Sequence, residues 1–207
     1  MYLDRVQKAF EEHYEVEETA AALWNETVKK LERDYGNVGR VYTEKYEEGK
    51  ALYDATIAAS REKGIAIVKE EFAKLGDIVR EFVTSPVPDG FAATLEAIKV
   101  VGEGITEAEA EVYLEKYKNN YMACLSLSQC FQNQTGRRYY VARYDAIKND
   151  IAEYEGYAVD YFDNHASGIF KALYASPEQS PVMKFDVVLQ NFIKNDVRSY
   201  ESLTVTE

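Results

Sequence analysis

Two histidines and two cysteines are the residues of this chain best suited to chemistry: His13, His165, Cys124 and Cys130. His13 lies among glutamates, and Glu17 follows it by one helical turn, so a weak metal contact is one interpretation. We favour a histidine on a solvated acidic helix face. His165 falls on an apolar stripe, where a histidine satisfied within a core or an interface is the default interpretation.

A di-iron site in a helical bundle would need a Glu-x-x-His motif on two helices. The residues three positions before the two histidines are Phe10 and Phe162, so the motif is missing at both. Cys124 has no histidine nearby in the sequence and no basic residue on the preceding turn that would favour a nucleophilic thiolate. The chain also contains no Gly-rich phosphate loop and no G-x-S-x-G motif. We therefore predict no catalytic, cofactor-binding or metal-ligating residue, no cofactor, no small-molecule substrate and no enzymatic activity.

The two cysteines are too far apart on a helix to form a disulfide. Their separation of six residues corresponds to a rotation of ~240° and a rise of ~9 Å. We expect Cys124 and Cys130 to be small buried hydrophobic residues of a protein in a reducing compartment.

The composition indicates an acidic globular protein, with 46% hydrophobic residues and a net charge of −12. This charge disfavours binding to nucleic acid or to an anionic membrane, because both need Lys and Arg. The N-terminal stretch is charged throughout, and no apolar run approaches the ~18 residues of a membrane span, so we expect a soluble protein. Seventeen tyrosines are unusual for this length. They suit half-buried helix faces, either in the core or in an interface.

An alternating spacing of four and three residues between apolar side chains runs through the N-terminal part of the chain and is typical of a heptad seam. The first run comprises Trp24, Val28, Leu31, Tyr35, Val38 and Tyr42, and the second comprises Ile65, Val68, Phe72, Leu75, Val79 and Phe82. The two runs are out of phase, so a stutter or a turn must lie between them. Gly36, Gly39, Gly49 and Gly64 are candidates for a turn. Two interpretations stay open: a helical hairpin, or a long rod that pairs with a second chain.

The segment Thr84–Gly90 contains two prolines and a glycine and is the clearest boundary in the chain. We expect a short amphipathic helix at Phe91–Val101, with Leu95 and Ile98 facing inward. The Gly-Glu-Gly sequence at 102–104 should end this helix.

The stretch Ile105–Phe131 follows, and we expect the rest of the chain to be organised around it. Thr106 predicts a helix N-cap, because its hydroxyl can accept from the backbone N–H of Glu109 while the Glu109 carboxylate accepts from the backbone N–H of Thr106. The pair Asn119-Asn120 predicts a break, and we therefore expect two helices here. The apolar contacts of the stretch should come from Val112, Leu114, Tyr117, Tyr121, Leu125 and Phe131.

A third long helical segment is predicted to start near Arg137 and to end at Ser176-Pro177. Its seam is rich in tyrosine and comprises Tyr140, Tyr144, Ile147, Ile151, Tyr154, Ala158, Tyr161 and His165, followed by Ile169, Phe170 and Leu173. Ser180 and Pro181 predict the cap and first position of a final helix. We expect the last residues, SYESLTVTE, to form a loose tail.

These patterns predict an all-α protein: long amphipathic, coiled-coil-like helices or a helical hairpin, packed with a smaller helical bundle. We divide the chain into a long helical, coiled-coil-like segment at 1–84, a short-helix unit at 85–136 and a helical C-terminal segment at 137–207. The last of these should pack with the unit before it.

Within the central stretch, four pieces resemble a segment of uncharacterised proteins from tailed-phage and prophage structural gene clusters. The pieces are Ile105-Thr106-Glu107-Ala108-Glu109, Tyr113-Leu114-Glu115, Lys116-Tyr117-Lys118-Asn119-Asn120, and the apolar helix from Tyr121-Met122 onward. The N-terminal half agrees with that family in character only, and its tyrosines and glycine breaks depart from a simple rod-like scaffold. The resemblance implies a scaffolding or head-associated role in virion assembly, with no active site to carry over.

The leading hypothesis is therefore a non-enzymatic phage structural or assembly protein in the bacterial host cytoplasm or the virion. It would act through helix-mediated self-association as a homo-oligomer and through binding to capsid, other phage or host proteins, because amphipathic helices gain stability mainly from packing. The alternative is an acidic phage inhibitor that binds and blocks a host nuclease or defence complex by presenting carboxylates as phosphate mimics. Neither hypothesis involves direct binding to nucleic acid or to a membrane.

Overall fold

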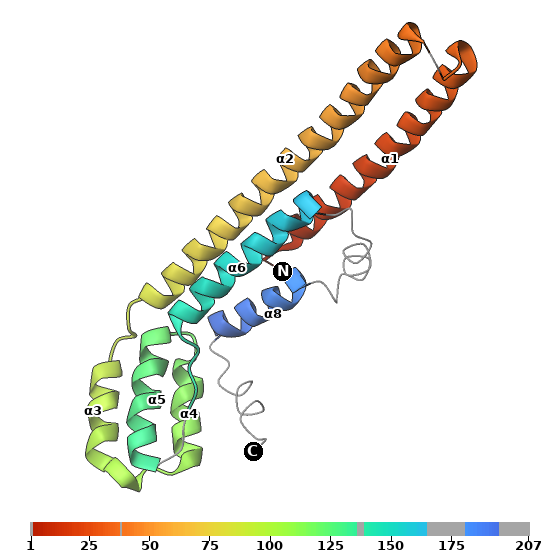
Figure 1. The fold of residues 1–207 in the computed structure, drawn as a ribbon. Coiled ribbons are helices and arrows are strands. Elements are labelled where there is room, and N and C mark those ends of the chain that lie inside the picture. Colours follow the sequence, from red (N-terminus) through yellow and green to blue (C-terminus); the bar gives the residue numbers. More distant parts are fainter. Residues whose placement is uncertain (1, 38, 136–138, 165–180, 195–207) are drawn as a thin grey trace. The chain divides into compact units, whose positions relative to one another are not determined.

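The computed structural model describes residues 2–37, 39–135, 139–164 and 181–194 (Figure 1). Over these residues the chain forms seven α-helices and one short 3₁₀ helix, with no strand. The predicted all-α class is confirmed. None of the helices in the described ranges combines the length and the apolar character that crossing a bilayer requires.

The chain forms two compact units, and three of its helices contribute residues to both. The first unit comprises Met1–Phe72 and Tyr154–Met183, and the second comprises Ala73–Glu153 and Lys184–Glu207. The shared helices are α2 (Arg40–Thr84), α6 (Tyr144–Asn164) and α8 (Pro181–Lys194). The units therefore interleave along the sequence.

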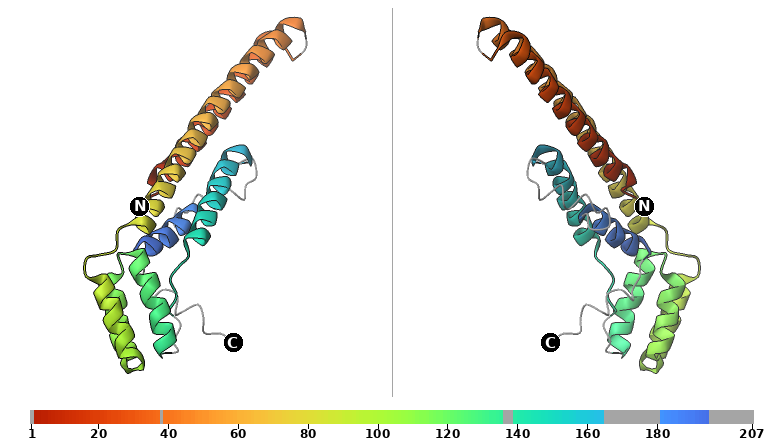
Figure 2. Two further views of the ribbon diagram at one scale, coloured as in Figure 1. Left: turned by 90° about the vertical axis from the view of Figure 1, so that its left-hand side faces the viewer. Right: turned by 90° about the vertical axis from the view of Figure 1, so that its right-hand side faces the viewer.

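In the first unit, α1 (Asp4–Tyr35) and the following part of α2 form an antiparallel helical hairpin, as Figures 1 and 2 show. The turn uses Gly36 at φ 69° and Gly39 at φ 125°, which lie in the left-handed region that favours glycine. The hairpin interpretation is thus confirmed for this part of the chain. The first predicted seam is wrong as a single stripe, because Tyr35 ends one helix and Tyr42 lies in the next.

Ion pairs across the hairpin set the register of its two helices. Near the start of α1, Arg5 Nη1 lies 2.5 Å from Glu71 Oε1, and further along Lys63 Nζ lies 2.9 Å from Glu12 Oε2. The two helices therefore run antiparallel, with the start of α1 opposite the later part of this stretch of α2.

A third helix, α6, packs on the end of the hairpin that lies away from its turn. Tyr161 and Phe162 of α6 lie against Phe10 of α1, with ring centroids 4.3 and 5.2 Å apart. Phe162 also lies on the backbone of α2, because a Cβ at Gly64 would stand 2.2 Å from its Cε1 atom. Gly64 and Gly49 both lie inside α2. The prediction of a turn at either glycine is wrong.

The second unit contains α3 (Phe91–Val101), a 3₁₀ helix (Gly102–Gly104), α4 (Glu107–Tyr117), α5 (Tyr121–Thr135) and the described part of α8 (Pro181–Lys194) that follows Met183. The predicted end of the long helix at Thr84, the short helix and the two central helices are confirmed. So is the capping box: Thr106 N donates to Glu109 Oε2 at 2.8 Å, and Glu109 N donates to Thr106 Oγ1 at 3.3 Å. These hydrogen bonds hold the pKa of Glu109 below its ordinary value, the backbone bond contributing most.

The predicted break between the central helices rests on Asn120. Its Oδ1 atom accepts from the backbone N–H of Ala123 at 2.9 Å and so caps α5. Its Nδ2 atom donates to the carbonyl of Pro86 at 2.9 Å, which ties the boundary loop to the start of α5.

An aromatic core holds the second unit together. Phe82 of α2 lies with its ring centroid 6.1 Å from that of Tyr121 and 5.6 Å from that of Phe192. The second predicted seam is buried from Val68 to Phe82, and its members Leu75, Val79 and Phe82 belong to this unit.

Two expectations for the C-terminal half are wrong, one is confirmed, and the others fall outside the described ranges. The third helical segment begins at Tyr144 and not near Arg137, because residues 139–143 lie outside any helix. Val112 does not supply core contacts, since it is 68% exposed. The final helix begins at Pro181 as predicted. The expectations for His165, Ile169, Phe170, Leu173, Ser176-Pro177, Ser180 and the tail fall on residues that the structure does not describe.

Candidate functional site: a groove on the helical hairpin

The part of the hairpin nearest its turn, residues 20–56, is called the arm here, and the part that α6 packs on is called the base. In the arm, aromatic side chains hold α1 and α2 together. The Trp24 ring lies 4.9 Å from that of Tyr46 and 6.3 Å from that of Tyr53, measured between centroids. Gly49 makes this approach possible, because a Cβ there would stand 2.8 Å from Trp24 Cζ3.

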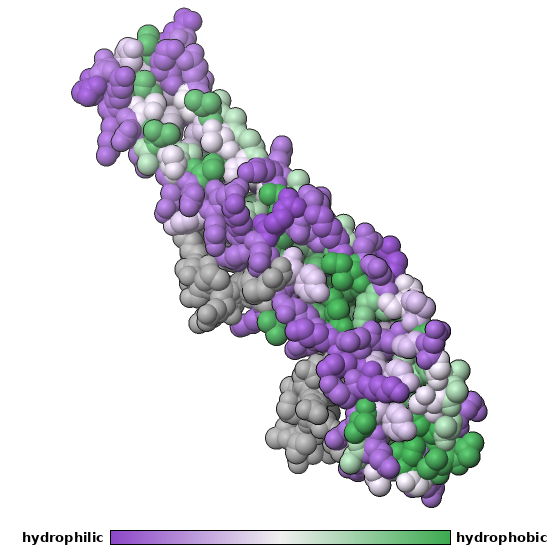
Figure 3. All heavy atoms as spheres, turned by 180° about the vertical axis from the view of Figure 1, so that it is seen from behind, coloured by the Kyte–Doolittle hydropathy of each residue, from purple (hydrophilic) through white to green (hydrophobic). Residues whose placement is uncertain are grey.

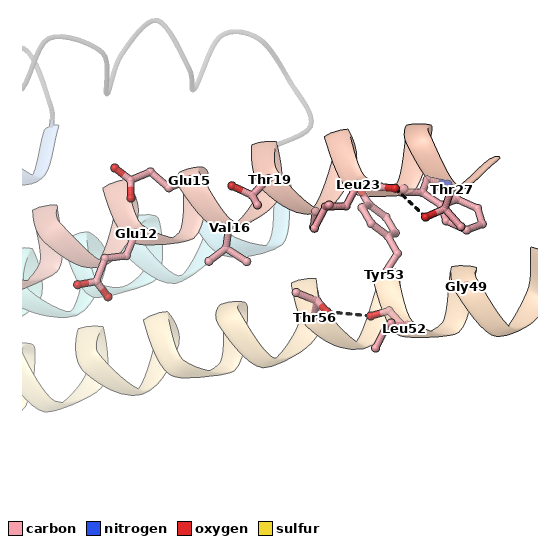
Figure 4. A pocket seen from close by; sticks show the side chains of 12 residues that line it. Glu12, Glu15, Val16, Thr19, Leu23, Thr27, Gly49, Leu52, Tyr53 and Thr56 are labelled. Carbon is pink, nitrogen blue, oxygen red and sulfur yellow. Dashed lines mark hydrogen bonds between the residues drawn. The ribbon is translucent and has the colours of Figure 1, made fainter. Parts of the chain in front are cut away.

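Beside this aromatic contact, a groove of about 600 Å³ runs between α1 and α2. Figure 4 shows its side chains coming from both helices, with Glu12 and Val16 pointing from α1 toward α2. The lining residues are Glu12, Glu15, Val16, Thr19, Ala20, Leu23, Trp24 and Thr27 of α1, and Gly49, Leu52, Tyr53 and Thr56 of α2.

The groove presents apolar side chains to solvent. Leu23 is 59% exposed and Leu52 is 70% exposed. The Thr27 hydroxyl donates to the Leu23 carbonyl at 2.8 Å, and the Thr56 hydroxyl donates to the Leu52 carbonyl at 2.9 Å (Figure 4). Because these hydroxyl protons are already used within each helix, the groove is suited to an apolar partner surface. Figure 3 shows apolar side chains reaching the surface along the arm.

An ion pair closes the end of the groove that lies toward the base. Lys63 donates to Glu12 at 2.9 Å, and this hydrogen bond, followed by the Lys63 charge, holds the pKa of Glu12 below its ordinary value of 4.5. Glu15 is exposed beside it. The groove therefore has a polar end at the base and an apolar middle at Leu23 and Leu52.

The arm is close to electrically neutral, but the stretch of α1 before it is acidic. Residues 20–56 contain six Lys and Arg against seven Asp and Glu, while residues 12–19 contain four Glu, of which Glu12 and Glu15 line the groove. Several of these charges are paired within one helix, as in Arg40–Glu44, Lys45–Glu48 and Lys50–Asp54. An electrically balanced surface allows close approach of another copy without strong repulsion.

His13 lies in the base, where the structure places it differently from the prediction. It is 1% exposed and packs against the Phe162 ring at 5.1 Å, so the solvated acidic face is wrong. Its Nδ1 atom lies 3.0 Å from Ser60 Oγ, and its Nε2 atom lies 3.6 Å from Glu17 Oε1. Sequence reasoning missed Ser60, which is 47 residues away and reaches His13 only through the hairpin.

Serine, histidine and glutamate are the residue types of a hydrolytic triad, but this set lacks other parts of one. All three lie within α1 and α2, where backbone N–H groups are bonded along the helix and cannot form an oxyanion hole. None of the three lines the groove. Nearby, burial and, to a smaller extent, Glu17 and Tyr14 raise the pKa of Tyr161 to about 12, so this phenol stays neutral. The cluster thus serves packing between α1, α2 and α6.

The two cysteines lie in α5 and are not bridged. Cys124 is fully buried, and its thiol donates to the Tyr117 carbonyl at 3.3 Å. Cys130 is only partly buried, contrary to expectation, and lines a shallow hollow of about 510 Å³ between α3 and α5. Burial raises the pKa of the Cys130 thiol, which favours its neutral form.

Within the described ranges, no group of three or more His, Cys, Asp or Glu side chains is placed to hold a metal ion. No protein-family model, curated protein or solved structure matches this chain. The groove and the charges around it are therefore the features of the described residues that bear on function.

Sequence reasoning did not identify the groove as a site. The predicted heptad seam correctly placed Trp24 at the helix contact. It did not include Leu23, which precedes Trp24 and lines the groove. A usable signal was present in the spacing of Thr19, Leu23 and Thr27, which lie one turn apart on one face of α1.

Proposed function

We propose that this protein is a non-enzymatic phage structural or assembly protein, of the scaffolding or head-associated type, that works through helix-mediated self-association. The groove of the arm is the observation that carries this proposal. In a monomer its apolar surface stays in contact with water, whereas burial of that surface against a partner contributes about 25 cal/mol per Å². Contiguous apolar surface on a protein often marks an interaction site.

The phage assignment has separate support from the central stretch. Its resemblance to phage structural-cluster proteins covers Ile105–Phe131, which forms α4 and most of α5 in the second unit. We propose that this unit supplies contacts to a capsid or other assembly protein, while the arm supplies contacts between copies.

The inhibitor alternative receives less support from the charge arrangement. A phosphate mimic needs carboxylates gathered on one face without neighbouring cations. Along α2, acidic residues alternate with basic ones in ion pairs such as Lys50–Asp54 and Arg80–Asp77.

Self-association is tested by sedimentation velocity and light scattering across the micromolar range. We expect the wild type to form a concentration-dependent oligomer. Leu23→Glu and Leu52→Glu should each weaken it, because each places a charge in the apolar middle of the groove. Both side chains are largely exposed, so the fold of the monomer should be unaffected.

Asn25→Glu is the matched control. Asn25 is exposed on α1 and does not line the groove, so adding the same charge there should leave association unchanged. A wild type that stays monomeric throughout the concentration range would contradict the proposal, as would equal effects of Leu23→Glu and Asn25→Glu.

A further inference from the structure

The exposed side of α1 carries a stripe of five residues: Glu15, Thr19, Leu23, Glu26 and Lys30. Their spacings of four, four, three and four residues place them on one helix face. The first three line the groove, and Glu26 and Lys30 continue the stripe beyond it. All five are exposed, and in the described part of the chain Glu15, Glu26 and Lys30 make no ion pair. These side chains are therefore available to a partner.

From the order of charges in this stripe we infer that it packs against the same stripe of a second copy, antiparallel about a two-fold axis beside Leu23, so that the second copy lies over the groove. This inference rests on the proposed function and adds the partner and its orientation to it. Glu15 and Lys30 are 15 residues apart, about 22 Å along the helix. The midpoint between them falls next to Leu23.

Reversing one copy about that midpoint brings compatible side chains together at each position. Glu15 meets Lys30 of the second copy, Thr19 meets Glu26 and can donate its hydroxyl to that carboxylate, and the two Leu23 side chains meet near the axis. Two-fold symmetry repeats each of these contacts, as in an isologous interface.

A parallel arrangement in the same register would bring like charges together. Glu15 would face Glu15, Glu26 would face Glu26 and Lys30 would face Lys30, and each such pairing is unfavourable. The charge order therefore selects the antiparallel form. The near balance of charge over residues 20–56 limits repulsion along the part of the stripe from Leu23 to Lys30, despite the net charge of −12 on each chain.

The orientation is tested by exchanging the two charges. Glu15→Lys and Lys30→Glu should each weaken association of the full chain roughly tenfold or more, because each creates two like-charge pairs per dimer. The double variant Glu15→Lys/Lys30→Glu should recover association close to the wild type, since the exchanged charges are complementary again. A double variant weaker than both single variants would overturn the antiparallel geometry, and single variants without effect would overturn the docking face.

Cysteine cross-linking gives a second readout in a Cys130→Ser background. A mixture of Thr19→Cys and Glu26→Cys chains should form the mixed disulfide under mild oxidation, whereas Thr19→Cys alone should not cross-link. Efficient cross-linking of Thr19→Cys with itself would overturn the inference in favour of a parallel pair.

These outcomes separate the inference from the proposed function. If Leu23→Glu abolishes association while the charge exchange fails to restore it, self-association stands and this docking geometry is wrong. If the wild type is monomeric, both are wrong.

Discussion

The base and the arm of the hairpin are built from the same two helices, but among the described residues a third helix packs on the base alone. At the base, Phe162 of α6 lies on Gly64 of α2 and is fully buried. In the arm, the ring that lies on the corresponding glycine, Gly49, is Trp24 from α1 itself, and it stays half-buried. The described residues place no third helix there, and Leu52 is 70% exposed.

The ion pairs of the base and of the arm also differ in which helices they join. At the base they link α1 to α2, as in Arg5–Glu71 and Glu12–Lys63. In the arm each links residues of one helix, as in Lys45–Glu48. The base is thus fixed by contacts within the chain, while the arm keeps an apolar face that a partner can cover.

The largest effect is expected for truncation of the ring at the base. Phe162→Ala should lower the free energy of unfolding by about 3–5 kcal/mol, because it removes a fully buried ring from contacts with α1 and α2. Trp24→Ala should cost less than half as much, since that ring is already partly solvated. Urea denaturation followed by circular dichroism measures both. Equal losses for the two variants would mean that the arm is as tightly packed as the base.

The two glycines should respond in opposite directions to the same substitution. Gly64→Ala places a methyl group against the buried Phe162 ring, and we expect overpacking to destabilise the protein by about 1–3 kcal/mol. Gly49→Ala meets a half-buried Trp24 that can shift, while the alanine favours the helix by up to about 1 kcal/mol. We therefore expect Gly49→Ala to be neutral or stabilising in thermal unfolding. A large loss of stability in Gly49→Ala would show that the Trp24 side chain cannot shift to accommodate the added methyl group.

Local signals in the sequence predicted the local structure well. The capping box at Thr106 and Glu109, the break before Tyr121 and the start of the last helix at Pro181 depend on neighbouring residues, so their chemistry is visible in a short window. The second heptad seam was predictable for the same reason, since the period of apolar residues defines the buried face of one continuous helix.

Long-range features were not predictable in this way. Gly49 and Gly64 look like helix breakers in the sequence, and only the hairpin shows that each makes room for an aromatic ring of another element. His13 looks solvated among its glutamates, and its burial depends on Ser60 and Phe162, which lie far away in the sequence. The groove likewise arises from the register of α1 against α2.

The smallest expected effect concerns the ion pair at the boundary between base and arm. Because Lys63 lowers the pKa of Glu12 in the folded state, this pair stabilises the protein above the ordinary carboxyl pKa of 4.5, and the contribution is lost as the pH falls through the lowered value. Lys63→Gln should therefore be slightly less stable than the wild type at neutral pH, and the difference should vanish in acid. Urea midpoints measured across this pH range give the comparison.

Lys50→Gln, which breaks a pair within one arm helix, should change the midpoint less, because a pair within one helix can partly persist in the denatured chain. If the two substitutions behave alike at every pH, the linkage of α1 to α2 by Glu12 and Lys63 contributes nothing that distinguishes the base from the arm.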